Sequence, residues 1–245
     1  MSDSSTALSA LSREYLTIAH NLANANTAGY KRRIGIFAEV GPTAGAGAAP
    51  AAGGGTGGSA AGVREQEFLD LSQGRLVQTG RTLDVALQGP GFLVVETDRG
   101  ERYTRNGIFR TDAQGRLVDA QQRAVAGEGG PITLPPTVSA NAIAIAEDGR
   151  LSAGGAQIGK LRIVEFDRPG ALRPVGDNVL EAPQGAQPAA ATKTTAHQGF
   201  QEASNVTPVN ELVALIRVTR LYEANVRTLQ ERGEWGKELM RVAMS

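Results

Sequence analysis

The segment of this chain that comes nearest to a catalytic motif is Gly154-Gly155-Ala156-Gln157-Ile158-Gly159-Lys160, which has the glycine and lysine spacing of a phosphate-binding loop. The next residue is Leu161, whereas such a loop needs a Ser or Thr at that position to hold magnesium. A strand is predicted after it, whereas phosphate binding uses the N-terminus of a helix. We therefore predict a hairpin turn here.

The other residue types that could support catalysis are sparse. His20 and His197 are the only histidines and fall in different predicted segments, so they assemble neither a metal ligand set nor a Ser-His-Asp arrangement. The absence of cysteine excludes disulfides and thiolate metal sites. A carboxylate-only active site stays open, because its two members can be far apart in the chain. The prediction is a protein that is not an enzyme and needs no cofactor.

Composition gives no indication of a charged or lipid partner. The 245 residues include 25 basic and 25 acidic side chains, so the overall charge does not favour nucleic acid or anionic lipid. No run approaches the length of a membrane span, and residues 1–20 lack the basic start and continuous apolar run of a secretory signal. We expect no nucleic acid, no small-molecule substrate and no membrane insertion.

Two amphipathic helices are predicted near the ends of the chain. Their apolar residues recur every three and four positions, the seam of a coiled coil: Leu8, Leu11, Tyr15, Ile18, Leu22 and Ala25 in the first, and Leu212, Leu215, Thr219, Tyr222, Val226 and Leu229 in the second. Ser204 or Asn205 is a candidate cap for the second helix, with Pro208 in its first turn. Each seam is only two to three heptads long, so it needs a partner, either the other terminus or a neighbouring subunit. Two ordinary helices packed on a globular core are the alternative.

The residues between the helices predict a small antiparallel β domain. Phe92–Val95 is an apolar run suited to a buried strand, and Asp98-Arg99-Gly100 and Asp112–Gly115 are typical hairpin turns. The predicted fold is mainly β with α, and its organisation is as follows: 1–33 an N-terminal assembly helix, 34–66 a flexible Gly/Ala/Pro-rich segment, 67–183 the β domain, 184–200 a linker and 201–245 a C-terminal assembly helix.

Four blocks, in order along the chain, resemble the signatures of the bacterial flagellar rod and hook proteins. They are Asn21-Leu22-Ala23-Asn24 with Thr27-x-Gly29-Tyr30-Lys31; Thr79 to Phe92; Tyr103-Thr104-Arg105-Asn106-Gly107-Ile108-Phe109 with Gly115-Arg116-Leu117-Val118; and Ser204-Asn205-Val206 with Glu211-Leu212-Val213 and Arg220-x-Tyr222-Glu223-Ala224-Asn225. Two departures accompany the match. The N-terminus before Asn21 is shorter than usual, and Gly233-Glu234-Trp235-Gly236 is expected to interrupt the last helix.

The resemblance implies a structural subunit of the flagellar basal-body rod, which polymerises through its terminal helices, transmits torque from motor to hook and is needed for motility. The implied partners are itself, other rod subunits and the flagellar type III export apparatus, and the implied location is the rod that spans the periplasm, reached without a cleaved signal peptide. Residues Gly129 to Pro135 favour the proximal-rod type, with the distal-rod type as the alternative. A monomeric soluble protein whose β domain binds a ligand is a further alternative.

The expected subunit contacts lie on both helices and in the signature segments. Gly29 is predicted to have a positive φ just past the first helix, and the asparagines to bond helix-end backbone groups or neighbouring subunits. The predicted interaction residues are Leu8, Leu11, Tyr15, Ile18, Asn21, Leu22, Asn24, Thr27, Gly29, Asn205, Leu212, Leu215, Tyr222, Val226 and Leu229.

Overall fold

The structure is a computed structural model that describes residues 2–40 and 62–244. The glycine-rich stretch expected to be flexible falls mostly on residues 41–61, outside the described residues. The chain forms two compact units: one comprises residues 1–22, 33–68 and 208–245, and the other residues 23–32 and 69–207. The predicted class, mainly β with a helix near each end of the chain, is confirmed.

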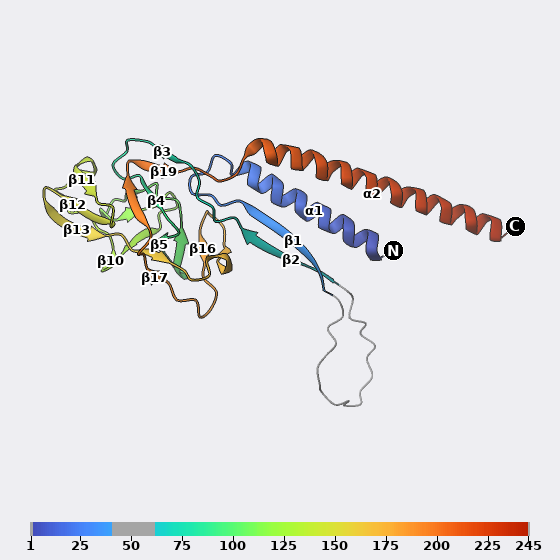
Figure 1. Cartoon of the computed structure of the whole chain (residues 1–245), viewed down its shortest axis with the longest axis horizontal. Helices are drawn as coiled ribbons and strands as arrows, with labels where there is room; N and C mark the ends of the chain where they lie inside the picture. Colours follow the sequence, from blue (N-terminus) through green and yellow to red (C-terminus); the bar gives the residue numbers. More distant parts are fainter. Residues whose placement is uncertain (1, 41–61, 245) are drawn as a thin grey trace, which may run out of the picture. The chain divides into compact units, whose positions relative to one another are not determined.

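The first unit contains both long helices and one hairpin-like pair of strands (Figure 1). Helix α1 spans Ser2–Ala23 and helix α2 spans Pro208–Ala243. Strands β1 (Arg33–Val40) and β2 (Gly62–Leu69) pair with each other. These strands occupy both ends of the stretch 34–66 that was expected to be flexible. Their strand pattern is hidden in the sequence because the partner strands are separated by the glycine-rich residues.

The buried face of α2 differs in phase from the predicted seam. Glu211 and Val218 are almost fully buried, at 1% and 2% exposure, whereas Leu212 is 46% exposed. The first half of the seam is therefore shifted by one residue, or about 100° around the helix. The reason is that Glu211 lies on the buried face, where it accepts a hydrogen bond from Asn21. A search for apolar periodicity does not consider a polar residue such as Glu211.

Helix α2 runs through Gly233-Glu234-Trp235-Gly236 without a break, so the expected interruption there is wrong. A helical glycine costs only about 0.5–1 kcal/mol relative to alanine. Two of them do not break a 36-residue helix, because neither removes a backbone hydrogen bond as a proline would. The start also differs from the prediction: the helix begins at Pro208, so Ser204 and Asn205 precede it and are not its caps.

The second unit is the β domain, and its strands are all antiparallel where they pair. Its largest sheet has the order β15-β16-β6-β5-β9-β8-β7, with β10 on β9 and β14 joining β5 to β17 (Figure 1). The strands are β5 (Phe92–Thr97), β6 (Gly100–Thr104), β7 (Arg110–Thr111), β8 (Leu117–Val118), β9 (Ala124–Gly127), β10 (Gly130–Pro131), β14 (Ile163–Glu165), β15 (Arg173–Pro174), β16 (Leu180–Glu181) and β17 (Ala189–Ala190).

Three smaller sheets complete the domain. One is the meander β11 (Ile143–Ile145), β12 (Arg150–Ala153) and β13 (Ala156–Lys160). The other two pair β18 (Thr195–Gln198) with β4 (Val85–Gln88), and β19 (Phe200–Glu202) with β3 (Leu76–Gln78). Two 3-10 turns, Ala140–Ala142 and Pro169–Ala171, lie in the connections. Residues 184–200, expected to be a linker, thus contribute β17 and β18, because their partner strands are remote in sequence.

Strand β5 lies between two apolar clusters, as its continuous apolar run predicts. Phe92 and Val94 belong to one cluster, in which Phe166 meets the rings of Phe92 and Tyr103 edge-on. Leu93 belongs to the other cluster, which also contains Phe109. Adjacent residues of a strand point to opposite faces of the sheet, so β5 contributes side chains to both clusters. This doubly buried strand is the centre of the β domain.

Candidate assembly site in the terminal segments

Asn21 joins the last turn of α1 to two other elements of the first unit. Its Oδ1 accepts a hydrogen bond from the Arg33 N–H at 2.9 Å, and its Nδ2 donates to the Arg33 carbonyl at 2.9 Å. The same Nδ2 donates to Glu211 Oε2, in the first turn of α2, at 3.4 Å. The Glu211 carboxylate there also faces the positive end of the α2 dipole. Asn21 therefore acts within the chain, and its described bonds hold α1, β1 and α2 together.

The segment after α1 is a tight turn built by its signature residues. The Thr27 N–H donates to the Asn24 carbonyl at 3.1 Å, and Thr27 Oγ1 donates to Asn24 Oδ1 at 3.2 Å. Gly29 has φ +68°, as predicted, and its N–H donates to the Glu202 carbonyl at 2.7 Å. A Cβ at Gly29 would lie 2.4 Å from the backbone of Arg105. Only glycine satisfies both the conformation and the close approach at this position.

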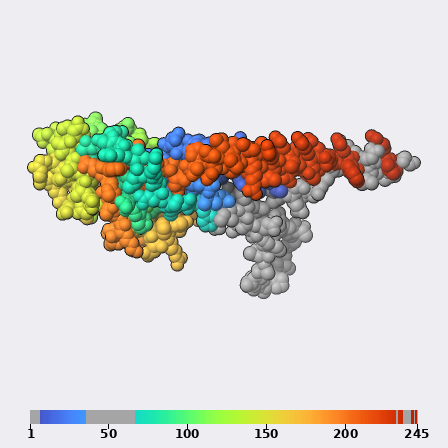
Figure 2. All heavy atoms as spheres, turned by 45° about the horizontal axis from the view of Figure 1, so that its top comes forward, coloured from blue at the N-terminus to red at the C-terminus, as the bar shows by residue number. Residues whose placement is uncertain are grey.

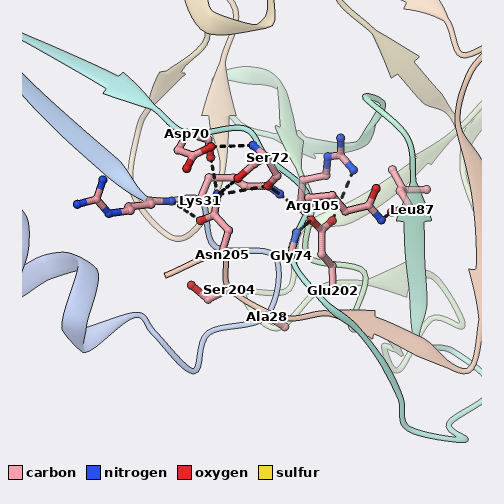
Figure 3. Close-up of polar contacts among 12 residues, drawn as sticks. Ala28, Lys31, Asp70, Ser72, Gly74, Leu87, Arg105, Glu202, Ser204 and Asn205 are labelled. Atoms are coloured by element: carbon pink, nitrogen blue, oxygen red, sulfur yellow. Dashed lines mark hydrogen bonds and ion pairs between the residues drawn. The ribbon is translucent and has the colours of Figure 1, made fainter. Parts of the chain in front are cut away.

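Asn205 connects three backbone segments of the second unit (Figure 3). Its Oδ1 accepts from the Arg32 N–H at 2.7 Å. Its Nδ2 donates to the Asp70 carbonyl at 2.8 Å and to the carbonyl and hydroxyl of Ser72 at 3.2 and 3.1 Å. Ser204 Oγ accepts from the Val206 N–H, which shapes the same turn. The C-terminal signature therefore clamps the N-terminal signature onto the residues that precede β3.

A buried ion network lies beside this clamp (Figure 3). Glu202 Oε1 accepts from Lys31 Nζ at 2.6 Å and from the Gly74 N–H at 2.9 Å, and Glu202 Oε2 accepts from Arg105 Nη1 at 3.5 Å. The side chains of Lys31, Arg105 and Glu202 are 4%, 3% and 0% exposed. Lys31 Nζ also donates to the Ser72 carbonyl at 2.7 Å. One carboxylate is thus shared by two buried cations from separate parts of the sequence.

Further contacts of Arg105 place it rigidly in this network. Its Nη2 donates to the Gly89 carbonyl at 2.6 Å, and its guanidinium carbon lies 4.9 Å from the centre of the Phe92 ring. Burial lowers the pKa of Arg105 and of Lys31 below their ordinary values, and the charge of Glu202 opposes that shift in both cases. The carboxylate therefore keeps the two cations charged in a site that water does not reach.

The sequence analysis missed the roles of Lys31, Arg105 and Glu202. Lys31 and Arg105 lie inside the matching signature blocks, but their spacing gives no indication of burial. Glu202 lies outside the quoted blocks, in a short strand whose pattern carries no strong signal. The available signal was indirect: Lys31 and Arg105 are cations in segments that also contain buried aromatic residues, Tyr30 and Phe109. A buried cation requires a buried anion.

Helices α1 and α2 share an apolar hollow within the first unit. Its volume is about 340 Å³, and it is lined by Leu11, Ser12, Tyr15, Leu16, Val218, Thr219 and Tyr222. Three predicted interaction residues, Leu11, Tyr15 and Tyr222, therefore meet at one place. Of the other predicted residues, Ile18 is buried, and Leu8, Leu22, Leu215 and Val226 are half-buried.

A second feature of α2 is an apolar stripe that the described residues leave uncovered. It consists of Val209, Leu212, Val213 and Ile216, which are between 46% and 67% exposed. Their spacing of three and four residues places them on one side of the helix. In Figure 2 the orange to red atoms of α2 are uncovered on the visible face. Predicted residue Leu229, farther along α2, is also exposed.

The motifs rejected in the sequence have structural roles. Gly154 and Gly155 form the turn between β12 and β13 with φ of +57° and +84°, which confirms the predicted hairpin. His197 lies in β18, where its ring meets Phe200 edge-on, and His20 lies on α1 with its pKa lowered by burial and by Arg33. Among the described residues, no helix is long and apolar enough to cross a bilayer.

Comparison with protein families identifies the class. Residues 4–31 match the model of the flagella basal body rod protein, residues 86–153 that of the flagellar hook protein FlgE/F/G D1 domain, and residues 197–234 that of the flagellar basal body rod FlgEFG protein C-terminal region. These matches contain most of α1, much of the β domain and most of α2. The fold and its terminal segments are thus those of the flagellar rod and hook class.

Individual relatives of this chain place it among the rod proteins of this class. The chain is 33% identical to the flagellar basal-body rod protein FlgF of Caulobacter vibrioides, over 91% of this chain and 89% of that protein. It is 33% identical to FlgF of Salmonella typhimurium, over 86% and 84%, and 32% identical to the rod protein FlgG of Agrobacterium fabrum, over 89% and 88%. The chain belongs to the flagellar basal-body rod protein family. It is a structural subunit and not an enzyme, as predicted.

Proposed function

We propose that this subunit is built into the proximal rod through α1 and α2, which pack coiled-coil-like against each other and against neighbouring subunits. The observation that carries the proposal is the exposed stripe Val209, Leu212, Val213 and Ile216 on α2. Burial of apolar side chains such as these lowers the free energy by about 25 cal/mol for each Å² of surface removed from water. A patch of this kind on a structural subunit marks an interaction surface.

The two compact units have different tasks in this proposal. The β domain has its own apolar clusters, so it folds around a core that needs no neighbour. The helical unit leaves its stripe for other subunits, and contacts between unlike surfaces repeat along a helix without closing into a ring. Such an assembly transmits torque from motor to hook because each subunit is held along the length of its helices. The other partners are the remaining rod subunits.

The proximal type is favoured over the distal type by the FlgF relatives together with the segment Gly129–Pro135. The assignment can be tested by expressing the chain in two strains. One lacks its proximal-rod subunit, and the other lacks its distal-rod subunit. Restored motility in the first strain alone is the expected result. Restoration in the second strain alone assigns the chain to the distal rod instead.

We further propose that the subunit is exported by the flagellar type III apparatus without cleavage of a signal peptide. Helix α1 begins at Ser2, and Leu11 and Tyr15 within it line the hollow shared with α2. Removal of a signal peptide of about 15–30 residues would remove these contacts. Mass spectrometry of the subunit from purified basal bodies is expected to find the α1 residues, and their absence would contradict uncleaved export.

The substitution Val213→Arg tests assembly through the stripe. Val213 is 62% exposed, so an arginine there leaves the isolated chain folded but puts a charge into the proposed contact. The expected result is a normal circular dichroism spectrum, with loss of motility and of incorporation into basal bodies. Val175→Arg is the matched control, because Val175 is an exposed valine of the β domain at 45%. Equal incorporation of both variants would rule out the stripe as an assembly surface.

A further inference from the structure

We propose that the hollow shared by α1 and α2 receives the side chain of Trp235 from a second copy of this chain. The inference rests on the proposed assembly through the terminal helices and specifies one of its contacts. Trp235 is the only tryptophan of the sequence and is 75% exposed on α2. Tryptophan is one of the side chains enriched among the buried anchors of protein interfaces.

The hollow has the chemistry and size that an indole requires. Its walls are the side chains of Leu11, Tyr15, Leu16, Val218 and Tyr222, and only Ser12 and Thr219 contribute hydroxyls. Its volume of about 340 Å³ accommodates a large side chain. An aromatic residue buries about 150–250 Å² of surface when it is enclosed. Tyr15 and Tyr222 place two rings where they can stack edge-on with an indole.

The same chain cannot place its own Trp235 in its own hollow. Trp235 follows Tyr222 by 13 residues on the continuous helix α2, which corresponds to about 20 Å along the axis at 1.5 Å per residue. It also points about 220° around the helix from Tyr222, on the side away from the hollow. A Trp235 side chain in this hollow therefore comes from another molecule.

These positions also determine the symmetry of the contact. The Trp235 side chain, here called the knob, and the hollow lie at different positions along α2 and on different sides of it. A copy whose hollow receives a knob therefore presents its own knob on another face. A contact of this heterologous type does not form a two-fold dimer, and it propagates as an open filament when the rotation between copies does not close a ring. It is thus compatible with the stacked subunits of the proposed assembly.

A mixing experiment with two full-length variants tests the inference. Trp235→Ala keeps the hollow but has no knob, and Leu16→Arg keeps the knob but blocks the hollow at a residue that is 64% exposed. Because the second variant carries the only tryptophan, its fluorescence reports Trp235 alone. Titration of Trp235→Ala into Leu16→Arg is expected to shift the emission to shorter wavelength and to saturate at one to one. Analytical ultracentrifugation is expected to find a heterodimer in the mixture and monomers of each variant alone.

The controls separate this contact from the wider proposal. Titration of the double variant Leu16→Arg/Trp235→Ala, which has neither partner surface, is expected to leave the emission unchanged, and Val175→Arg is expected to associate like the unmodified chain. An unmodified chain that stays monomeric at all concentrations, or a mixture without a shift, overturns the inference. If Trp235→Ala abolishes incorporation into basal bodies while the mixture gives no shift, the knob binds a different subunit and not a second copy. Failure of the mixture alone leaves the Val213→Arg result, and hence the proposed function, standing.

Discussion

Lys31 and Glu202 lie 171 residues apart and form an ion pair with 2.6 Å between Nζ and Oε1, at side-chain exposures of 4% and 0%. This pair joins the segment that follows α1 to the segment that precedes α2. Both segments belong to the same compact unit as the β domain. The signature segments near the two ends of the chain therefore build a common intramolecular anchor within this unit.

Replacement of Glu202 by glutamine is expected to destabilise the chain by about 3–5 kcal/mol, because removing one partner leaves buried charges without compensation. Glutamine retains a carbonyl oxygen for the Gly74 N–H but leaves Lys31 and Arg105 as adjacent buried cations. Urea denaturation of the full chain, followed by circular dichroism, measures the change in free energy of unfolding. The double variant Lys31→Met/Glu202→Met is expected to lose less than the sum of its single changes.

The matched control is Glu128→Gln. Glu128 forms an ion pair with Lys160 at 2.7 Å, but the side chains are 59% and 34% exposed. An exposed pair contributes only about 0–1 kcal/mol. A loss in Glu202→Gln no larger than that in Glu128→Gln would show that the buried pair is not the anchor described here.

Substitution of Gly29 by alanine is expected to be more damaging than the same change at Gly100. Both glycines have positive φ, +68° and +96°, which costs an alanine about 1–2 kcal/mol. At Gly100 the added Cβ meets nothing within 4 Å, whereas at Gly29 it lies 2.4 Å from Arg105 backbone. Overpacking of this kind adds about 1–3 kcal/mol. Thermal unfolding of the two variants measures the difference, and equal losses would contradict the close approach.

The local features of the fold could be predicted from the sequence. The apolar run Phe92–Val95 predicts the doubly buried strand β5, and Asp98-Arg99-Gly100 predicts the turn between β5 and β6. The positive φ of Gly29 follows from its place just past a helix. Each of these depends on residues that are close together in the chain, so periodicity and turn chemistry suffice.

The non-local features could not be predicted. Glu202 is buried because its partners Lys31 and Arg105 come from distant segments, and no spacing rule connects them. The phase of the buried face of α2 depends on Glu211, whose burial depends on Asn21 in another helix. Hydrophobic periodicity finds an apolar stripe but does not distinguish the stripe that faces the chain's own residues from one that is exposed.

Replacement of Asn205 by alanine is expected to cost about 2–3 kcal/mol. Its amide accepts from the Arg32 N–H and donates to the Asp70 and Ser72 carbonyls, and an unsatisfied backbone group costs about 1–3 kcal/mol. Aspartate would keep the acceptor but place a negative charge against both carbonyls, so Asn205→Asp is expected to be no better than alanine. Asn225→Ala, which loses a single bond to the Leu221 carbonyl in α2, is the control. The midpoint of denaturant unfolding measures the stability of all three variants, provided that the slope of the unfolding free energy against denaturant concentration is unchanged. If Asn205→Asp were as stable as the unmodified chain, the hydrogen bonds donated by the amide would contribute nothing to stability.

Asp70 is expected to make the anchor sensitive to acid. Hydrogen bonds from Ser72, with the charges of Arg32 and Lys31, lower the pKa of Asp70 below its ordinary value of 3.8. A carboxyl group with a lowered pKa in the folded state contributes stability that is complete above its unfolded value and is lost as the pH falls through the folded value. Asp70→Asn is therefore expected to lose under about 1 kcal/mol at pH 7, in keeping with a screened, partly exposed charge. The difference from the unmodified chain should shrink as the pH falls below about 4, whereas Asp98→Asn, in the exposed turn after β5, should change stability little at either pH. Free energies of unfolding measured at pH 7 and pH 3 check the sign, because a deficit for Asp70→Asn that is the same at both values would mean that its ionised form is not the stabilising one.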